Sequence, residues 1–188
     1  MRLPSISETL RKLSQVFDSL QVDYMLIGGY ALPAYGLLRA TVDIDIAIAI
    51  RPSEHTRLYT ELKNAGFQVS SLSEQTLCFV ITDLKAATEI EVWIKPDGIT
   101  IDQECLRRRR KRKIAGNDFW IIGPEHFIVN KLSRKDRRVQ DEADVLSVLM
   151  NNELALDIPF LHHLAGKTDI LPTLKTLQKK STTTMKRK

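Results

Sequence analysis

Two aspartates, Asp43 and Asp45, lie two residues apart in a segment of strictly alternating hydrophobicity, VDIDIAIAI over residues 42–50. Successive side chains of a β-strand point to opposite faces, so both carboxylates leave one face about 7 Å apart at the backbone. Like charges at that separation repel each other, and a divalent cation with oxygen ligands relieves the repulsion. Their neighbours on that face, Ala47 and Ala49, are small and leave room for a ligand. We therefore predict a metal-binding pair; the alternative, the solvent face of an edge strand, is less favourable because strands disfavour Asp.

A third carboxylate is available in a later segment, TEIEVWI over residues 88–94. Its alternation directs Ile90 and Val92 to the core and Glu89 and Glu91 to the opposite face. A third acid is what a two-metal phosphoryl-transfer site requires, since it completes the ligands of the metal that activates the attacking oxygen. For either glutamate taken singly, an exposed strand face is the alternative.

Paired glycines, Gly28 and Gly29, follow a short apolar run over residues 24–27 and precede a segment, residues 30–35, that predicts a brief helix. Glycines there let the backbone approach a ligand and direct its N–H groups, with the helix N-terminus, at phosphate. Such a turn is common by itself. The Asp-x-Asp strand that follows makes this turn stronger evidence for a phosphate-binding site.

In this order these residues resemble the DNA polymerase β-like nucleotidyltransferase superfamily, which has a strand ending in Gly-Gly, a strand with Asp-x-Asp and a later strand with a third acid. Glu91 matches the third acid, with Glu89 as the less favoured choice, although the superfamily usually has Asp there. The stretch GGYALPAYGLLRATVDIDIAI is similar to the branch that includes AbiEii-type toxins and related small nucleotidyltransferases. Arg39 and Thr41 match the Arg-x-Thr-x-Asp-x-Asp element of that branch.

The segment after residue 123 is similar to the Lys-Leu helix and Asp-x-x-Asp segment of the same branch, and the resemblance covers roughly residues 20–150. It places Lys131 near the nucleotide phosphates. The Gly-Gly-x-Val-Arg-Asp motif of CCA-adding enzymes and the Gly-Ser-x-x-x-Gly motif of minimal antitoxins are absent from the sequence, so both of these roles are disfavoured.

The resemblance implies transfer of a nucleotidyl group from an NTP to an acceptor, with release of pyrophosphate. Asp43, Asp45 and Glu91 would hold two Mg²⁺ ions, with Mn²⁺ as the alternative ion. The nucleotide would be bound by five further residues: Gly28, Gly29, Arg39, Thr41 and Lys131. The relatives suggest a toxin-like activity with tRNA as the leading acceptor. The alternative is a non-catalytic module that retains the fold and binds nucleotide or nucleic acid.

The elements around these residues indicate an α/β fold: a small mixed sheet, helices packed on one face, the carboxylates on the other, and a C-terminal helical extension. Apolar segments predict strands at residues 24–27, 42–50, 67–70, 76–82, 88–94 and 119–122. Helical periodicity predicts helices from a capping box at Ser5-x-x-Glu8 to Leu20, from a cap at Ser53 to Asn64, and over 124–133 and 139–150. We divide the chain into a core (1–123), a helical extension of the same domain (124–174) and a basic, disordered tail (175–188).

Of the 28 Lys and Arg residues, against 23 Asp and Glu, 13 lie in two clusters. Six lie within residues 175–188, and outside the two clusters the net charge is −8. The other cluster is a basic run within residues 106–113: Arg107, Arg108, Arg109, Arg110, Lys111, Arg112 and Lys113. Cations this close together resist burial, so we predict a solvated loop that contacts RNA. A solubilising loop, or a contact with the acidic body of another subunit, is the alternative.

The length of 188 residues fits one domain. No apolar run approaches the ~20 residues of a membrane span and the N-terminus lacks a signal-peptide segment, so we expect a cytoplasmic protein with no membrane partner. Cys78, Cys105 and the pair His162-His163 show no metal-ligand spacing, and we expect them to be packed or idle side chains. The sequence has no Walker motif and no G-x-G-x-x-G, which excludes P-loop and Rossmann sites.

Overall fold

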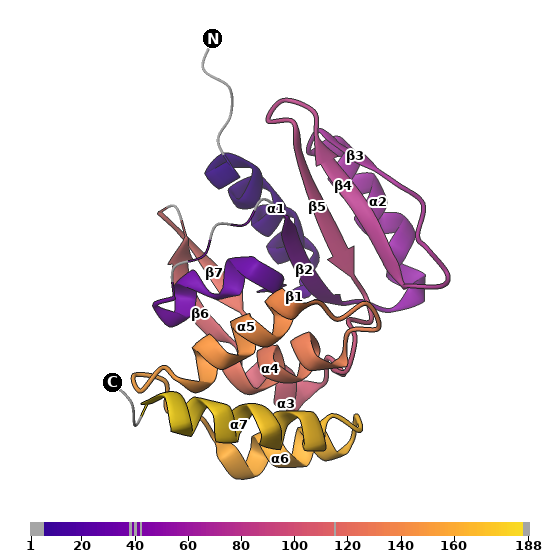
Figure 1. The fold of residues 1–188 in the computed structure, drawn as a ribbon. Helices are drawn as coiled ribbons and strands as arrows, with labels where there is room; N and C mark the ends of the chain where they lie inside the picture. The colour runs from indigo at the N-terminus through magenta and orange to yellow at the C-terminus, as the bar shows by residue number, and fades with distance from the viewer. Residues whose placement is uncertain (1–5, 38, 40, 42, 115, 186–188) are drawn as a thin grey trace.

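A seven-stranded mixed sheet forms the centre of the molecule in the computed structural model, which describes residues 6–37, 39, 41, 43–114 and 116–185 (Figure 1). The strand order is β3-β4-β5-β2-β1-β7-β6. The strands are β1 (Asp23–Ile27), β2 (Ile44–Ala49), β3 (Phe67–Val69), β4 (Cys78–Asp83), β5 (Thr88–Trp93), β6 (Arg110–Ile114) and β7 (Asn117–Ile121). Strand β2 is central, antiparallel to β1 and parallel to β5. The mixed α/β architecture is confirmed.

Two helices, α1 (Ile6–Leu20) and α2 (His55–Asn64), pack against the sheet face that carries the apolar side chains of β2. On β1, Tyr24 packs its ring 5.1 Å from that of Phe17 in α1, and Tyr24 is the register partner of Ile48. Ile44, Ile46 and Ile48 are buried on this face. Because side chains alternate along a strand, Asp45 projects from the other face, as predicted.

The start of β2 and the start of α2 differ from the sequence predictions. Asp43 precedes the strand, which begins at Ile44, and Val42 lies outside the described residues. Ser53 does not cap α2: it lies in a 3₁₀ turn, η3 (Pro52–Glu54). The turn is closed instead by Glu54, whose carboxylate accepts hydrogen bonds from the backbone N–H and the guanidinium of Arg51. The proposed Ser5 cap of α1 also lies outside the described residues.

The segment predicted as one brief helix after the paired glycines forms two 3₁₀ turns, η1 (Gly28–Ala31) and η2 (Pro33–Tyr35). Gly36 ends the second turn with a φ of 78°, a left-handed conformation that favours glycine. The short turns bring the chain back toward β2, where η1 packs against the strand.

The C-terminal part is helical, with α4 (Pro124–Ser133), α5 (Val139–Leu149), α6 (Ile158–Gly166) and α7 (Leu171–Met185) following a short α3 (Gln103–Arg107). The disordered tail predicted from residue 175 is wrong as far as Met185, because α7 continues to that residue. Leu174, Leu177 and Ser181 are buried, and this packing orders a segment that its charge alone made look solvated. Residues 186–188 are outside the described part of the chain.

The basic run does not form a solvated loop: it spans the end of α3 and most of β6. Arg108 pairs with Glu104 at 2.6 Å and with Asp157 at 3.1 Å, and its guanidinium lies 3.6 Å from the Phe160 ring centroid. Acids distant in sequence therefore neutralise cations that look unpaired in the sequence.

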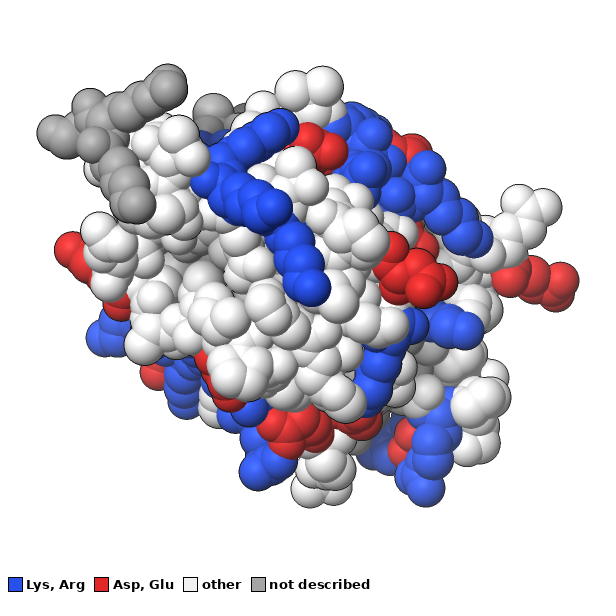
Figure 2. Space-filling model, turned by 60° about the horizontal axis from the view of Figure 1, so that its bottom comes forward, with Lys and Arg blue, Asp and Glu red and all other residues white. Residues whose placement is uncertain are grey.

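Arg109 is also held within the protein, through Asp23 at 2.9 Å and the carbonyl of Tyr24 at 2.8 Å. Lys111, Arg112 and Lys113 remain exposed on β6, an edge strand. On the face shown in Figure 2, acidic and basic side chains are interspersed rather than segregated. In the described part of the chain, no helix is both long and apolar enough to cross a bilayer.

Candidate active site

Asp45 and Glu91 are brought side by side by the pairing of β2 with β5, in which they are register partners. Burial, which outweighs the opposing charges of Lys131 and Arg134, raises the pKa of Asp45, and the charge of Asp43 raises it further. Partial burial likewise raises the pKa of Glu91, and Asp45 adds to this through its charge and a hydrogen bond. The two carboxyl groups thus repel each other, and the charges of Lys131 and Arg134 offset that repulsion and the burial only in part.

Gly28 is fitted against the Asp45 carboxylate. Its φ is 63°, and a Cβ atom at this position would overlap the carboxylate of Asp45. Both features require glycine, the first because L side chains rarely adopt that conformation and the second because the backbone must approach the acid closely. The sequence pattern Gly-Gly before Asp-x-Asp therefore has a direct steric explanation.

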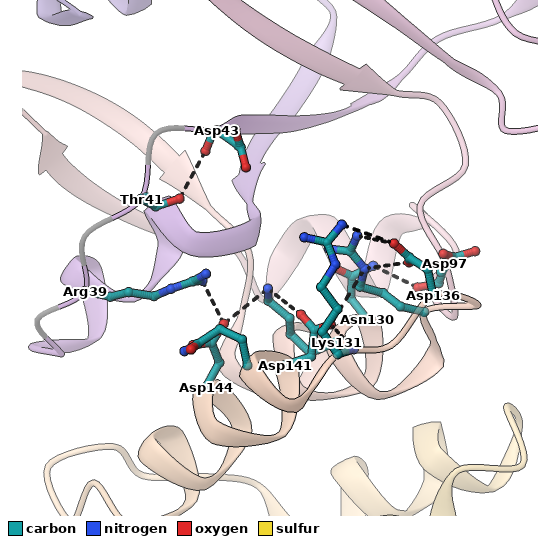
Figure 3. Close-up of polar contacts among 12 residues, drawn as sticks. Arg39, Thr41, Asp43, Asp97, Asn130, Lys131, Asp136, Asp141 and Asp144 are labelled. Atoms are coloured by element: carbon teal, nitrogen blue, oxygen red, sulfur yellow. Dashed lines mark hydrogen bonds and ion pairs between the residues drawn. The ribbon is translucent and has the colours of Figure 1, made fainter.

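Gly29 makes room for the two other residues of the predicted nucleotide site that precede β2. A Cβ atom on Gly29 would lie 2.8 Å from both Arg39 Nη1 and Thr41 Oγ1. The Thr41 hydroxyl donates to the main-chain carbonyl of Asp43 at 3.5 Å (Figure 3). Asp43 itself is exposed, yet its charge reaches the site, because it raises the pKa values of both Asp45 and Glu91.

Lys131 lies in a buried ion cluster, which we define as Lys131, Asp141, Asp144 and Arg39 (Figure 3). Lys131 Nζ, on a side chain only 5% exposed, is 2.9 Å from Asp141 Oδ1 and 3.2 Å from Asp144 Oδ2. Arg39 Nη1 donates to the same Asp144 oxygen at 2.8 Å. The cluster therefore ties α4 to α5 and ties both helices to the segment before β2.

A cleft of about 1040 Å³ runs from this face of the sheet to α6. It is lined by Gly28, Asp45, Glu91 and Lys131, while Glu89 is not among its lining residues. This placement favours Glu91 over Glu89 as the third acid. The room predicted beside Ala47 is absent, because Ala47 is fully buried and its register partner Trp93 lines the cleft.

Two cleft residues, Trp93 and Arg134, were not singled out from the sequence. The Trp93 indole N–H is buried and has no hydrogen-bond partner in the described part of the structure. Arg134 lowers the pKa values of Asp45 and Glu91 through its charge. Strand alternation did place Trp93 on the face of Glu91. For Arg134 the available signal was its spacing, three residues after Lys131 and hence on the same side of a helix.

The acids fit a divalent cation by their chemistry, since Asp45 and Glu91 are oxygen donors whose mutual repulsion a cation would remove. Asp43 contributes a nearby negative charge but does not complete a three-residue metal site with Asp45 and Glu91. Among the described residues, no group of three His, Cys, Asp or Glu side chains is arranged to hold a metal ion.

Of the other candidate side chains, His163 lines the cleft, whereas His162, Cys78 and Cys105 are not among its lining residues. His162 Nε2 is 2.9 Å from Gln178 Oε1 on α7, and Cys105 is buried. Cys78 is half-buried at the site, where burial and the charges of Glu91 and Asp45 raise its pKa to about 12.

Comparison with known proteins identifies the family of this chain. The family model described as "Nucleotidyl transferase of unknown function (DUF2204)" matches residues 6–169. A search of curated proteins finds no match.

Three solved structures share the fold. The antibiotic-resistance factor ANT(2'')-Ia has a TM-score of 0.58 at 14% identity, covering 90% of this chain and 95% of that one. The lincosamide antibiotic adenylyltransferase LnuA, bound to lincomycin, has a TM-score of 0.54 at 14% identity, covering 78% and 98%. An antigenic nucleotidyltransferase-like protein from Paracoccidioides brasiliensis has a TM-score of 0.52 at 21% identity, covering 92% and 91%.

Proposed function

This chain belongs to the family described as nucleotidyl transferases of unknown function, and we propose that its cleft transfers a nucleotidyl group from an NTP to an acceptor hydroxyl. One observation carries the proposal: Asp45 and Glu91 are register partners on paired strands, with the Gly28 backbone fitted against Asp45 in the same cleft. Its premise, the resemblance to the polymerase β-like superfamily, is confirmed.

We propose that Asp45, Glu91 and Asp43 hold divalent cations, Mg²⁺ or Mn²⁺. Such cations supply charge neutralisation of the triphosphate and of the transition state. The acceptor oxygen forms a bond to the α-phosphorus as the bond to the bridging oxygen breaks, and pyrophosphate leaves. Glu91 would complete the ligands of the cation that lowers the pKa of the acceptor hydroxyl, whose proton passes to solvent.

The predicted nucleotide ligands divide into two kinds. Gly28 and Gly29 offer backbone that approaches the acids, and we propose that their N–H groups bind the triphosphate. Arg39 and Lys131 are already paired with Asp144, so we propose that they act chiefly as positioning residues. Arg39 fixes the segment that carries Thr41 and Asp43, while Lys131 adds a positive field at Asp45.

For the acceptor, we propose RNA, with tRNA as the leading candidate and a toxin-like modification as its consequence. Since Arg108 and Arg109 are paired within the protein, the contact falls on the exposed cations of β6: Lys111, Arg112 and Lys113. Replacing these three by Gln should weaken RNA binding and reduce its dependence on salt concentration, because fewer counterions are released. An unchanged salt dependence would remove RNA from the proposal.

A small hydroxylated molecule is the second candidate acceptor, favoured by the aromatic walls of the cleft, Trp93 and Phe160. The lincomycin-bound neighbour has such a ligand, but at 14% identity it supports the fold alone.

The decisive experiment measures transfer of label from each α-labelled NTP, with Mg²⁺, to bulk RNA and to a cell extract. Asp45→Asn and Glu91→Gln should reduce labelling at least about 100-fold, because they remove groups that act on the reacting atoms. Glu89→Gln is the matched control and should label like the wild type, since Glu89 does not line the cleft. Equal labelling by all variants contradicts the proposal, and NTP binding that needs no Mg²⁺ and gives no transfer supports a non-catalytic binding module.

A further inference from the structure

Arg134 is a cation of the cleft whose two-bonded partner, Asp136, is exposed to solvent. It lies just after the last residue of α4, one turn beyond Lys131, and its side chain is 31% exposed. Its charge acts on both Asp45 and Glu91, which shows that the guanidinium lies within electrostatic reach of the acid pair. A group in this position is well placed to meet a polyphosphate that is drawn to the same acids by a cation.

Lys131 is less available for that task. Two carboxylates, Asp141 and Asp144, lie within 3.2 Å of its Nζ, and both are almost fully buried. Moving Lys131 toward a ligand would take its charge away from two buried acids, of which Asp144 keeps Arg39 as a partner, and this is costly.

Arg134 pairs instead with Asp136, which is in the turn between α4 and α5. Its Nε also lies 3.9 Å from Asp141 Oδ2, a longer contact. Arg134 Nε donates to Asp136 Oδ1 and Nη2 donates to Oδ2, each at 3.2 Å. This two-bonded arrangement of a guanidinium and an oxyanion is the one that arginine also makes with phosphate. The Asp136 side chain is 60% exposed, so water can replace Arg134 around it at little cost.

We propose that Arg134 binds the triphosphate of the incoming NTP and that Asp136 is an internal substitute for phosphate, which Arg134 releases when the nucleotide binds. The inference rests on the proposed function and names a substrate contact for it. Arg138, whose Nη2 is 3.5 Å from Asp136 Oδ2, retains the carboxylate after the exchange.

Titration calorimetry with each NTP and Mg²⁺, and with tripolyphosphate as a probe without a base, tests the exchange. Arg134→Gln should weaken binding about tenfold, because it removes two charge-assisted hydrogen bonds. Asp136→Asn should tighten binding about threefold or more, because Arg134 is then free before the ligand arrives. The double variant should bind like Arg134→Gln alone.

The neighbouring pair of Arg137 and Glu142, 3.6 Å apart, offers matched controls, since neither residue lines the cleft. Arg137→Gln and Glu142→Gln should leave affinity within about twofold of the wild type. Thermal denaturation of every variant verifies folding. Arg134→Lys, which keeps the charge and loses the planar fork, should bind with intermediate affinity.

The outcomes separate this inference from the proposed function. NTP binding that is unchanged in both Arg134→Gln and Asp136→Asn overturns the inference and leaves the proposed function standing. Failure of the wild type to bind any NTP or tripolyphosphate overturns both.

Discussion

The acid pair of Asp45 and Glu91 and the buried ion cluster around Lys131 lie in walls of one cleft, yet they are built in opposite ways. In the acid pair, burial and like charge raise both pKa values. In the cluster, burial also acts to raise the pKa of Asp141, but a backbone N–H of Arg138 and the ammonium of Lys131 hold it below the usual value.

The difference separates charges that support the fold from charges available to a ligand. The cluster satisfies its acids internally and joins α4, α5 and the segment before β2. The acid pair is compensated only in part, by the charges of Lys131 and Arg134, so its electrostatic energy improves when a cation or a proton arrives.

Breaking the balanced cluster should have the largest effect. Lys131→Met should lower the free energy of unfolding by about 3–5 kcal/mol, because two buried acids lose their shared partner. Urea denaturation measures this loss. Asp45→Asn should leave stability unchanged or higher, since it removes repulsion, and Lys135→Met is the control for an exposed cation. Equal losses in Lys131→Met and Asp45→Asn would contradict the distinction between the two regions.

The pH dependence of the free energy of unfolding should also distinguish the two regions. It is measured with a chelator present, to exclude metal ions. An acid whose pKa is raised in the folded state holds its proton longer there, so its contribution to stability falls as the pH rises from about 4 through the raised pKa. Asp45→Asn should therefore gain stability relative to the wild type across that range.

Asp141 should behave with the opposite sign, because its pKa is lowered in the folded state. Its contribution is present above its ordinary pKa and is lost as the pH falls toward the lowered value. The stability deficit of Asp141→Asn should accordingly shrink in acid. A parallel pH profile for the two variants would refute this assignment.

The smallest expected effect is on the reactivity of Cys78, which reports the electrostatic potential at the acid pair. Its thiol pKa, about 12, is raised first by burial and then by Glu91 and Asp45. Divalent cations at the acids should lower it and speed alkylation by iodoacetamide roughly two- to fivefold, since the thiolate is the reactive form. Cys105, with a pKa of about 12 raised by burial and Asp102, is the internal control and should not respond. Mass spectrometry of the labelled peptides measures both rates.

Local patterns were enough to predict most elements. Helical and alternating periodicities located α1, β2, β5 and α4 correctly, because burial on one side imposes a fixed repeat on each element. The prediction failed at Ser53 and in the basic tail, where capping and order depend on neighbours: Arg51 with Glu54 in the first case and the packing of α7 in the second.

The sequence by itself determined that Asp45 and Glu91 leave the face opposite the apolar side chains of their strands, and that glycines precede the Asp-x-Asp strand. Backbone geometry sets strand alternation and the conformations open to glycine, so both can be inferred from neighbouring residues. Only the tertiary structure decided that β2 lies beside β5 with these two acids in register. It also decided that Arg108 is neutralised by Asp157, and that Lys131 is enclosed while Arg134 is partly exposed. Strand order and ion pairing join residues far apart in the chain, and their energies depend on burial that no local pattern contains.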